Sequence, residues 1–141
     1  MKILKKVALV ISIFTATNMF GQDIIDANGD KVAELESSGI LYDGDHVQVG
    51  KFLENGGIVN AEGLEIGSIE GYDFKDPMGT VLGRIDANNN VFDLNNSKIG
   101  SVQAGLMVID ANNHVLGRAS SSIEATRLVA YFFFFFNNGL M

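Results

Sequence analysis

Calcium binding is the first chemistry to consider for this sequence, because some of its carboxylates are spaced as in a calcium-binding loop. The run Asp-Ala-Asn-Gly-Asp at 26–30 looks like the start of such a loop, and Asp-Ala-Asn-Asn-Asn at 86–90 echoes it. An EF-hand loop also needs a bidentate acid at its twelfth position, where this chain has Ser37 and Ser97. These acids are better explained as turn formers whose side chains accept hydrogen bonds from the backbone. No metal site is predicted.

This chain contains few of the residues that nucleophilic or acid–base catalysis uses. It has no cysteine and only two histidines, His46 and His114, which both fall in expected turns. Acids are plentiful, but no two of them stand out as the pair that hydrolysis by carboxylates requires. No glycine cluster joins a strand to a helix, so phosphate and dinucleotide loops are absent. The sequence therefore predicts no catalytic, cofactor-binding or metal-ligating residue, and no cofactor.

An internal repeat of about 17 residues provides the elements that carry these acids. Six copies align on a small residue, called the anchor from here on: Ala33, Gly50, Gly67, Gly83, Gly100 and Gly117. The anchors are separated by 17, 17, 16, 17 and 17 residues. Seven residues before each anchor stands an Asp or Asn: Asp26, Asp43, Asn60, Asp76, Asp93 and Asp110. Such regularity predicts six copies of one structural unit.

Each copy is interpreted as a β-hairpin. The Asp or Asn starts a type I turn, and the residue three positions later is Gly or Asn in five of six copies. These two residue types tolerate a positive φ, so a three-residue turn with a G1 bulge is expected. His46 is the exception, and the turn at 43–45 is expected to shift there.

This turn predicts a register for the hairpins. The residues nine before and one before each anchor should lie opposite each other, and all twelve are apolar. Ile24 would pair with Val32 on the inward face, while mixed pairs such as Ile25 with Lys31 lie on the wetter face. The apolar residues then change face at the anchor. Each anchor is predicted to be a bend or a close-approach site, where a Cβ would clash with the next copy.

Residues 1–21 are predicted to form a secretory signal peptide, cut near Gly21 or Gln22. Lysines open the chain, and an apolar run at 7–14 follows that is too short to span a membrane. A buried N-terminal strand or a retained anchor segment is the alternative. Without these residues the chain has seven Lys and Arg and 17 acids, so its formal charge is 7 − 17 = −10. Export to the periplasm, cell surface or exterior is expected, without nucleic-acid binding.

The C-terminal segment, 120–141, differs from the repeat region at 22–119. Residues 121–124 (Ser-Ser-Ile-Glu) offer a capping box for a short helix. The run from Leu128 to Phe136 is wholly apolar and ends in five consecutive phenylalanines. We expect it to pack into the same domain, as a buried strand or plug surrounded by the hairpins. The alternative is a surface for a partner or for self-association.

The combination of an export signal, Asp-started hairpins and an aromatic end resembles the bacterial 5-fold β-flower proteins. Residues 108–118 (Val-Ile-Asp-Ala-Asn-Asn-His-Val-Leu-Gly-Arg) and 131–136 (Tyr and five Phe) carry the resemblance. It implies an all-β fold of about five to six pseudo-symmetric hairpins around a core closed by the Phe-rich segment, and it implies no activity. Because six copies are counted, either a terminal copy stands outside a five-fold ring or blades are assembled across copy boundaries.

Two classes of function are compatible with this sequence. The first is an exported, non-catalytic binding or structural module of the cell envelope or exterior, whose partner is a glycan, a peptide or an envelope component. The second is a hydrolase or other enzyme with a site in the central cavity or on the turn face. Departures from the repeat are mild (Ala33 for glycine, Lys75 among apolar neighbours, the His46 turn), which favours binding. Homo-oligomerisation through the Phe-rich end is a third alternative.

Overall fold

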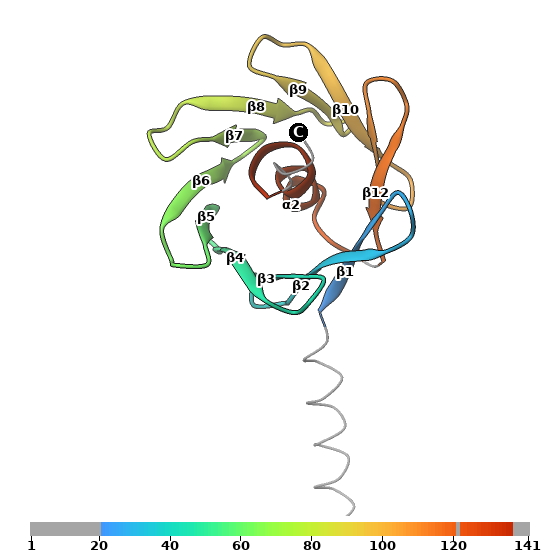
Figure 1. Cartoon of the computed structure of the whole chain (residues 1–141). Coiled ribbons are helices and arrows are strands. Elements are labelled where there is room, and N and C mark those ends of the chain that lie inside the picture. The colour runs from blue at the N-terminus through green and yellow to red at the C-terminus, as the bar shows by residue number, and fades with distance from the viewer. Residues whose placement is uncertain (1–20, 121, 137–141) are drawn as a thin grey trace, which may run out of the picture.

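Twelve antiparallel strands form one closed barrel in the computed structural model, which describes residues 21–120 and 122–136 (Figure 1). The strands are β1 (Gln22–Asp26), β2 (Lys31–Leu35), β3 (Ile40–Asp43), β4 (Gln48–Phe52), β5 (Gly57–Asn60), β6 (Glu65–Glu70), β7 (Asp73–Lys75), β8 (Val81–Ile85), β9 (Asn90–Asp93), β10 (Lys98–Gln103), β11 (Met107–Asp110) and β12 (Val115–Ala119). Each strand pairs with its neighbours in sequence, and β12 pairs with β1. The predicted signal peptide lies outside the described residues, apart from Gly21.

All six predicted hairpins stand in this ring, from β1–β2 to β11–β12. Of the two alternatives for the sixth copy, a terminal copy outside the ring is therefore wrong. The sheet also continues through the copy boundaries, since β2 pairs with β3 as well as with β1. Full closure satisfies the edges that an open sheet would leave unpaired.

A bulge in the second strand of each hairpin sets the register. Ile25 pairs with Lys31 as predicted, but Ile24 lies opposite Ala33, and Val32 is the extra residue between these pairs. The same shift occurs in the other five hairpins. The predicted pairing of Ile24 with Val32 is thus wrong by one position. Two residues of a bulged strand oppose one residue of its partner, so Val32 still packs against the core.

The anchors themselves face the inside of the barrel. Ala33 and Leu35 are both buried, as alternate residues of one strand on one face should be. The predicted change of face at the anchor is therefore wrong, and the bulge accounts for the pattern that suggested it. The innermost layer consists of the residues nine before the anchors, all at most 1% exposed: Ile24, Leu41, Ile58, Phe74, Val91 and Val108.

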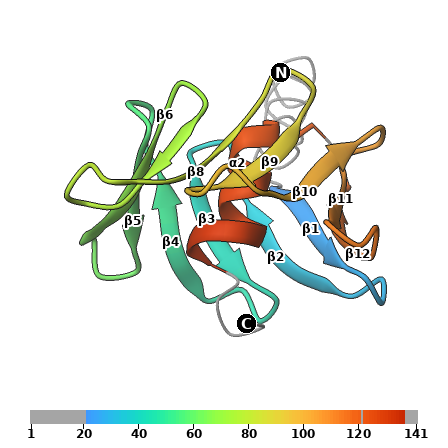
Figure 2. The same cartoon turned by 90° about the horizontal axis from the view of Figure 1, so that it is seen from above.

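The C-terminal segment runs through the middle of the barrel as a helix (Figures 1 and 2). α2 (Ala125–Val129) continues directly into η1, a π-helical segment at Ala130–Phe135. Burial as a plug is confirmed, whereas the strand alternative is wrong. The predicted capping box does not cap the helix, because Glu124 is the N-cap and makes no side-chain cap hydrogen bond. Ser121 lies outside the described residues.

The five phenylalanines of this helix match five of the six hairpins. The ring of each phenylalanine lies against an anchor glycine. Each following phenylalanine contacts the anchor of the hairpin that precedes in the sequence. The contacts are Phe132 with Gly117, Phe133 with Gly100, Phe134 with Gly83, Phe135 with Gly67, and Phe136 with Gly50. Each of the five anchor glycines also closely approaches a backbone carbonyl of the next hairpin, such as that of Val59 for Gly50. The close-approach role predicted for the anchors is confirmed for these five glycines.

The π-helical winding makes this arrangement possible. A π-helix closes i→i+5 hydrogen bonds, so consecutive side chains are separated by a smaller angle than in an α-helix. The rings of Tyr131 and Phe136, five positions apart, stack at 6.3 Å between centroids. One turn therefore carries five aromatic side chains and distributes them around the barrel. Among the described residues, no helix is long and apolar enough to cross a membrane.

Candidate functional site: the turn face

Six tight turns lie at one end of the barrel, and their Asp or Asn side chains hold them together. In the first turn, Oδ1 of Asp26 accepts hydrogen bonds from the backbone N–H groups of Asn28 at 2.9 Å and Asp30 at 3.0 Å. The same pair of bonds is made in each of the other five copies. These side chains are therefore used by the backbone, as the turn interpretation predicted.

The fourth residue of every turn adopts a positive φ. His46 has a φ of 64°, close to the 65° of Asn96 and Asn113 in the same position. The expected shift of the second turn is therefore wrong: Oδ1 of Asp43 accepts from the same two backbone positions as in the other copies. A left-handed backbone conformation is less favourable for His than for Gly or Asn. The imidazole of His46 stacks on the ring of Tyr42, with 4.3 Å between the ring centroids.

Both histidines lie on the surface. His46 is exposed and contacts Tyr42. Nδ1 of His114 lies 3.4 Å from Oδ2 of Asp110 in its own turn. Within the part of the chain that the structure describes, no catalytic arrangement is assembled around either imidazole. Among residues 21–120 and 122–136, no three His, Cys, Asp or Glu side chains gather as metal ligands would.

Backbone donors lower the pKa of two carboxylates in turns, Asp110 on this end of the barrel and Asp86 on the opposite end. The N–H of His114 is the main cause that lowers the pKa of Asp110, followed in the same direction by that of Asn112. The N–H of Asn90 likewise lowers the pKa of Asp86, in the turn that joins β8 to β9. A carboxylate that accepts backbone hydrogen bonds holds its negative charge to lower pH.

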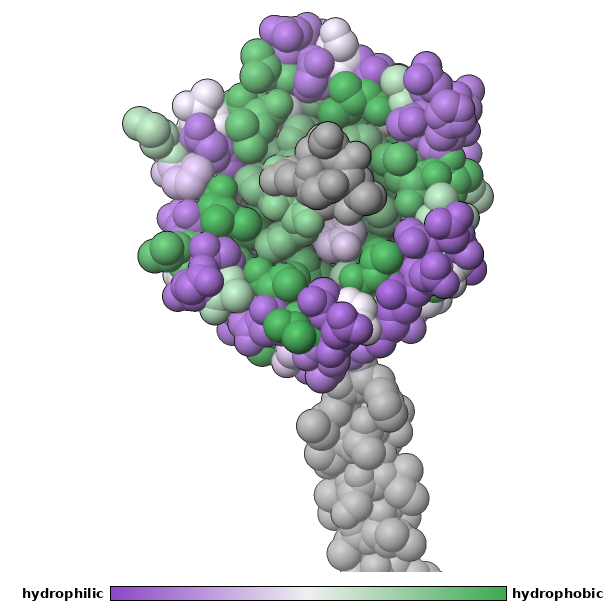
Figure 3. All heavy atoms as spheres, viewed as in Figure 1, coloured by the Kyte–Doolittle hydropathy of each residue, from purple (hydrophilic) through white to green (hydrophobic). Residues whose placement is uncertain are grey.

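We call this end of the molecule the turn face. It comprises the six turns at 26–31, 43–48, 60–65, 76–81, 93–98 and 110–115, and the six apolar residues that precede the anchors. Figure 3 looks onto this end and shows hydrophobic residues inside a largely hydrophilic rim. Six large apolar side chains of the turns are exposed: Met78 (91%), Leu94 (67%), Leu64 (65%), Val47 (58%), Val115 (43%) and Val81 (38%). Several large exposed apolar side chains at one end of a protein are typical of an interaction surface.

These apolar side chains were not among the residues predicted from the sequence to be functional. A single Leu or Met in a turn is unremarkable on a protein surface. The signal that was available is their repetition: the second, third, fourth and fifth turns each carry one such residue at more than half exposure. Only the closed ring shows that the four lie at the same end of the molecule.

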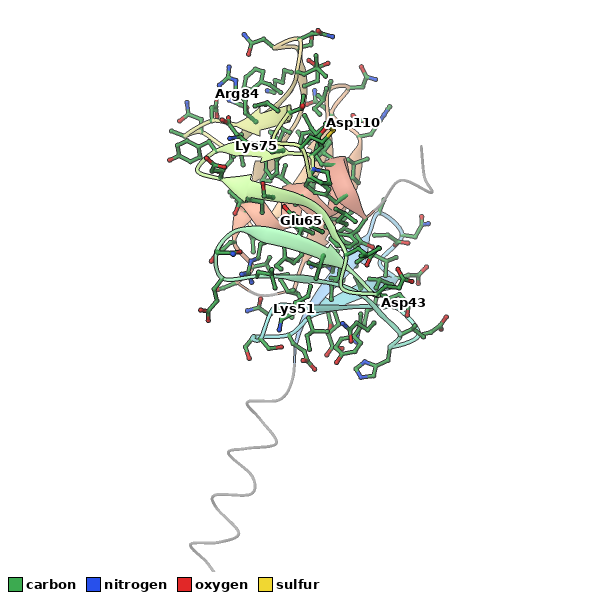
Figure 4. All side chains as sticks on the ribbon, turned by 90° about the vertical axis from the view of Figure 1, so that its left-hand side faces the viewer. Asp43, Lys51, Glu65, Lys75, Arg84 and Asp110 are labelled. Atoms are coloured by element: carbon green, nitrogen blue, oxygen red, sulfur yellow. The ribbon has the colours of Figure 1, made fainter. Side chains whose placement is uncertain are left out.

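The turn face is strongly acidic. Its six turns contain nine Asp and Glu residues against two lysines, Lys31 and Lys98, a formal balance of 2 − 9 = −7. Arg84 brings one further cation, since its Nη2 donates to Oδ1 of Asn96 at 2.6 Å and its guanidinium lies 4.7 Å from the Phe92 ring centroid. Figure 4 shows Asp43 and Asp110 toward this end of the barrel.

A shallow hollow of about 250 Å³ lies at the opposite end, beside the start of α2. Gly71 lines it, within the two-residue junction between β6 and β7, where the repeat is one residue shorter than elsewhere. Glu54, Glu124 and Arg127 are its charged lining residues, and the Arg127 guanidinium lies 5.4 Å from the Phe52 ring centroid. Within the described chain, Arg127 forms no ion pair with either glutamate.

The fold makes this protein an all-β barrel, a closed ring of six antiparallel hairpins that is filled by one aromatic helix. The chain is a member of the 5-fold beta-flower protein family, whose family model matches residues 21–137. No curated protein and no solved structure matches the chain. The match confirms the family resemblance drawn from the repeats and the Phe-rich end.

Proposed function

We propose that this protein is an exported, non-catalytic binding or structural module of the cell envelope or exterior, and that the turn face is its binding surface. The observation that carries the proposal is the use of the Asp and Asn side chains that start the turns: in every copy Oδ1 accepts hydrogen bonds from two backbone N–H groups. The acids that could have acted in catalysis or metal binding stabilise the turns instead. What remains for a partner is the pattern of charge and apolar side chains on the turns.

The filled interior argues against the enzyme alternative with a central site. Tyr131 and Phe132 are at most 7% exposed and lie where a central cavity would have to be. Tightly packed rings leave little room for a substrate or for ordered water. An enzyme of this fold would need its site on the outside, where no candidate pair of catalytic groups is assembled among the described residues.

Export is tested by following the full chain in a bacterial host. We expect the chain to be recovered outside the cytoplasm, with an intact mass that corresponds to a start near Gln22. Val10→Asp, which places a charge in the apolar run, should leave the full-length chain in the cytoplasm. Val47→Asp adds the same charge on an exposed turn and should not change export. Full-length wild-type chain in the cytoplasm would overturn the exported module.

A further inference from the structure

We infer that the turn face binds a cationic polypeptide segment that carries apolar side chains. This inference rests on the proposed function, and it deepens that function by naming the partner's chemistry. It follows from two properties that coincide on one surface of the described chain. These properties are an excess of carboxylates in the turns and a set of exposed apolar side chains among them.

Charge decides the sign of the partner. Even with Arg84 included, three cations stand against nine carboxylates on the turn face. Lys31 is partly neutralised within its own hairpin, since its Nζ contacts both Asp23 and Glu34. A neutral or anionic partner that covered these carboxylates would remove their water without returning any attraction. A cationic partner compensates for that loss and is drawn to the face over a longer range.

The exposed apolar side chains require more than a charged partner. Leu64, Met78 and Leu94 are each more than 60% exposed on successive hairpins. Covering a side chain of this kind removes apolar surface from water, which favours binding. A purely basic partner would leave that contribution unused. Lys or Arg interspersed with Leu, Ile or Phe matches the acidic rim and the apolar groups at the same time.

The opposite end of the barrel provides an internal comparison. With Arg84 counted on the turn face, that face has a formal balance of 3 − 9 = −6, and the rest of residues 22–136 holds eight acids and four Lys and Arg, a balance of 4 − 8 = −4. Tyr72 is the one large apolar side chain there that is more than half exposed among the described residues. A cationic, apolar partner should therefore distinguish the two ends, although both are acidic.

Fluorescence anisotropy with the full chain tests this inference. The probe is a labelled peptide of three Lys-Leu-Leu-Lys repeats. Its comparators replace Lys by Glu, or Leu by Ser. We expect the Lys-Leu peptide to bind, its Kd to rise about tenfold or more between about 50 and 500 mM salt, and both comparators to bind at least about tenfold more weakly. No binding of the Lys-Leu peptide, or equal binding of the Lys-Ser peptide, would overturn the inference.

Two matched triple variants locate the binding surface. One reverses three exposed turn acids (Asp30→Lys, Asp45→Lys and Glu62→Lys), and the other reverses three exposed acids of the opposite end (Glu54→Lys, Glu70→Lys and Glu124→Lys). Both change the formal charge by the same amount. We expect the turn variant to weaken binding about tenfold and the other about twofold or less, with unfolding midpoints checked for both. Equal losses would show unspecific attraction to an acidic protein and would overturn the inference.

The apolar contribution is tested in the same way. Leu64→Ser with Leu94→Ser should weaken binding several-fold, whereas Tyr72→Ser at the opposite end should leave it unchanged. Unchanged binding by the double variant would contradict the apolar part of the inference. Because export is measured without any peptide, a failure of binding leaves the exported module standing. A failure of export leaves the peptide results interpretable.

Discussion

The aromatic ring of Phe134 occupies the space that a side chain on Gly83 would need. A Cβ placed on Gly83 would lie 2.5 Å from Cζ of Phe134 and would also clash with the backbone carbonyl oxygen of Phe92 in the next hairpin. The ring of Phe134 and the carbonyl of Phe92 therefore explain why this residue is a glycine. Its φ is not in the left-handed region, so backbone conformation does not require glycine here. Four more anchor glycines meet a phenylalanine in the same way.

Gly83→Ala should destabilise the barrel. The added methyl group meets a backbone carbonyl and a packed ring, and neither can move without disturbing the register or the helix. We expect a loss of about 1–3 kcal/mol in the free energy of unfolding, measured by urea denaturation. Gly57→Ala is the control, because its nearest contacts are side-chain atoms of Asn55 at 3.1 Å and Leu53 at 3.2 Å, and no backbone carbonyl or aromatic ring stands in the way. Equal stability of the two variants would contradict this account of the anchors.

Asn60 shows which property of the turn residue matters. It is the one Asn at a position otherwise occupied by Asp, and its Oδ1 accepts from the N–H groups of Glu62 and Leu64, both at 3.0 Å. Asn60→Asp should keep both bonds and leave stability nearly unchanged. Asn60→Ala should cost about 1 kcal/mol in thermal or urea unfolding, since both donors lose their protein partner. A loss of the same size in both variants would show that charge, and not acceptance of these bonds, sets the turn.

Asp110 should make stability depend on pH in the acid range. Its pKa in the folded chain is below the ordinary 3.8, chiefly because the N–H of His114 donates to its carboxylate. The unfolded chain therefore takes up the proton first as pH falls. The stabilisation is complete above the ordinary value and is lost as the pH falls through the lowered pKa.

The test compares acid unfolding of Asp110→Asn with that of Glu62→Gln. The Asn variant keeps an acceptor that does not titrate, so its free energy of unfolding should fall less between about pH 5 and pH 2 than that of the parent chain. Glu62 accepts no backbone hydrogen bond among the described residues, so its variant should follow the parent closely. An unchanged acid limb in Asp110→Asn would rule out this linkage.

Local chemistry made the turns predictable from sequence. An Asp or Asn and a Gly or Asn three residues later define one turn geometry, and all six turns were found at the predicted residues. The mixed pair of Ile25 with Lys31 followed from the same geometry. Beyond that pair the register was lost, because an apolar residue such as Val32 is equally suited to a paired and to a bulged position.

The C-terminal helix shows a second limit of the sequence pattern. Periodicity distinguishes a helix from a strand only where apolar and polar residues alternate, and residues 128–136 are all apolar. Burial was therefore predictable and conformation was not. The π-helical winding depends on the spacing of the hairpins around the barrel, which is a property of the closed ring. The same holds for the turn face, whose apolar residues are brought together only by ring closure.

Tyr131 should make the folded barrel lose stability at alkaline pH. It is 7% exposed, and burial is the main cause that raises its pKa above 10.0, with the charges of Asp43 and Asp26 acting in the same direction. The unfolded chain therefore loses this proton first as pH rises. The stabilisation is complete below about pH 10 and is lost as the pH rises toward the raised pKa of the folded state.

Tyr131→Phe removes the titrating group and keeps the ring. We expect its free energy of unfolding to fall less between about pH 9 and pH 11 than that of the parent chain. Tyr72→Phe is the matched control, because Tyr72 is 60% exposed and should leave the alkaline limb unchanged. Absorbance at about 295 nm gives an independent readout: the buried phenol of Tyr131 should ionise with unfolding, and this late step should be missing from Tyr131→Phe. If the late step persists in that variant, the buried phenol that resists ionisation is not Tyr131.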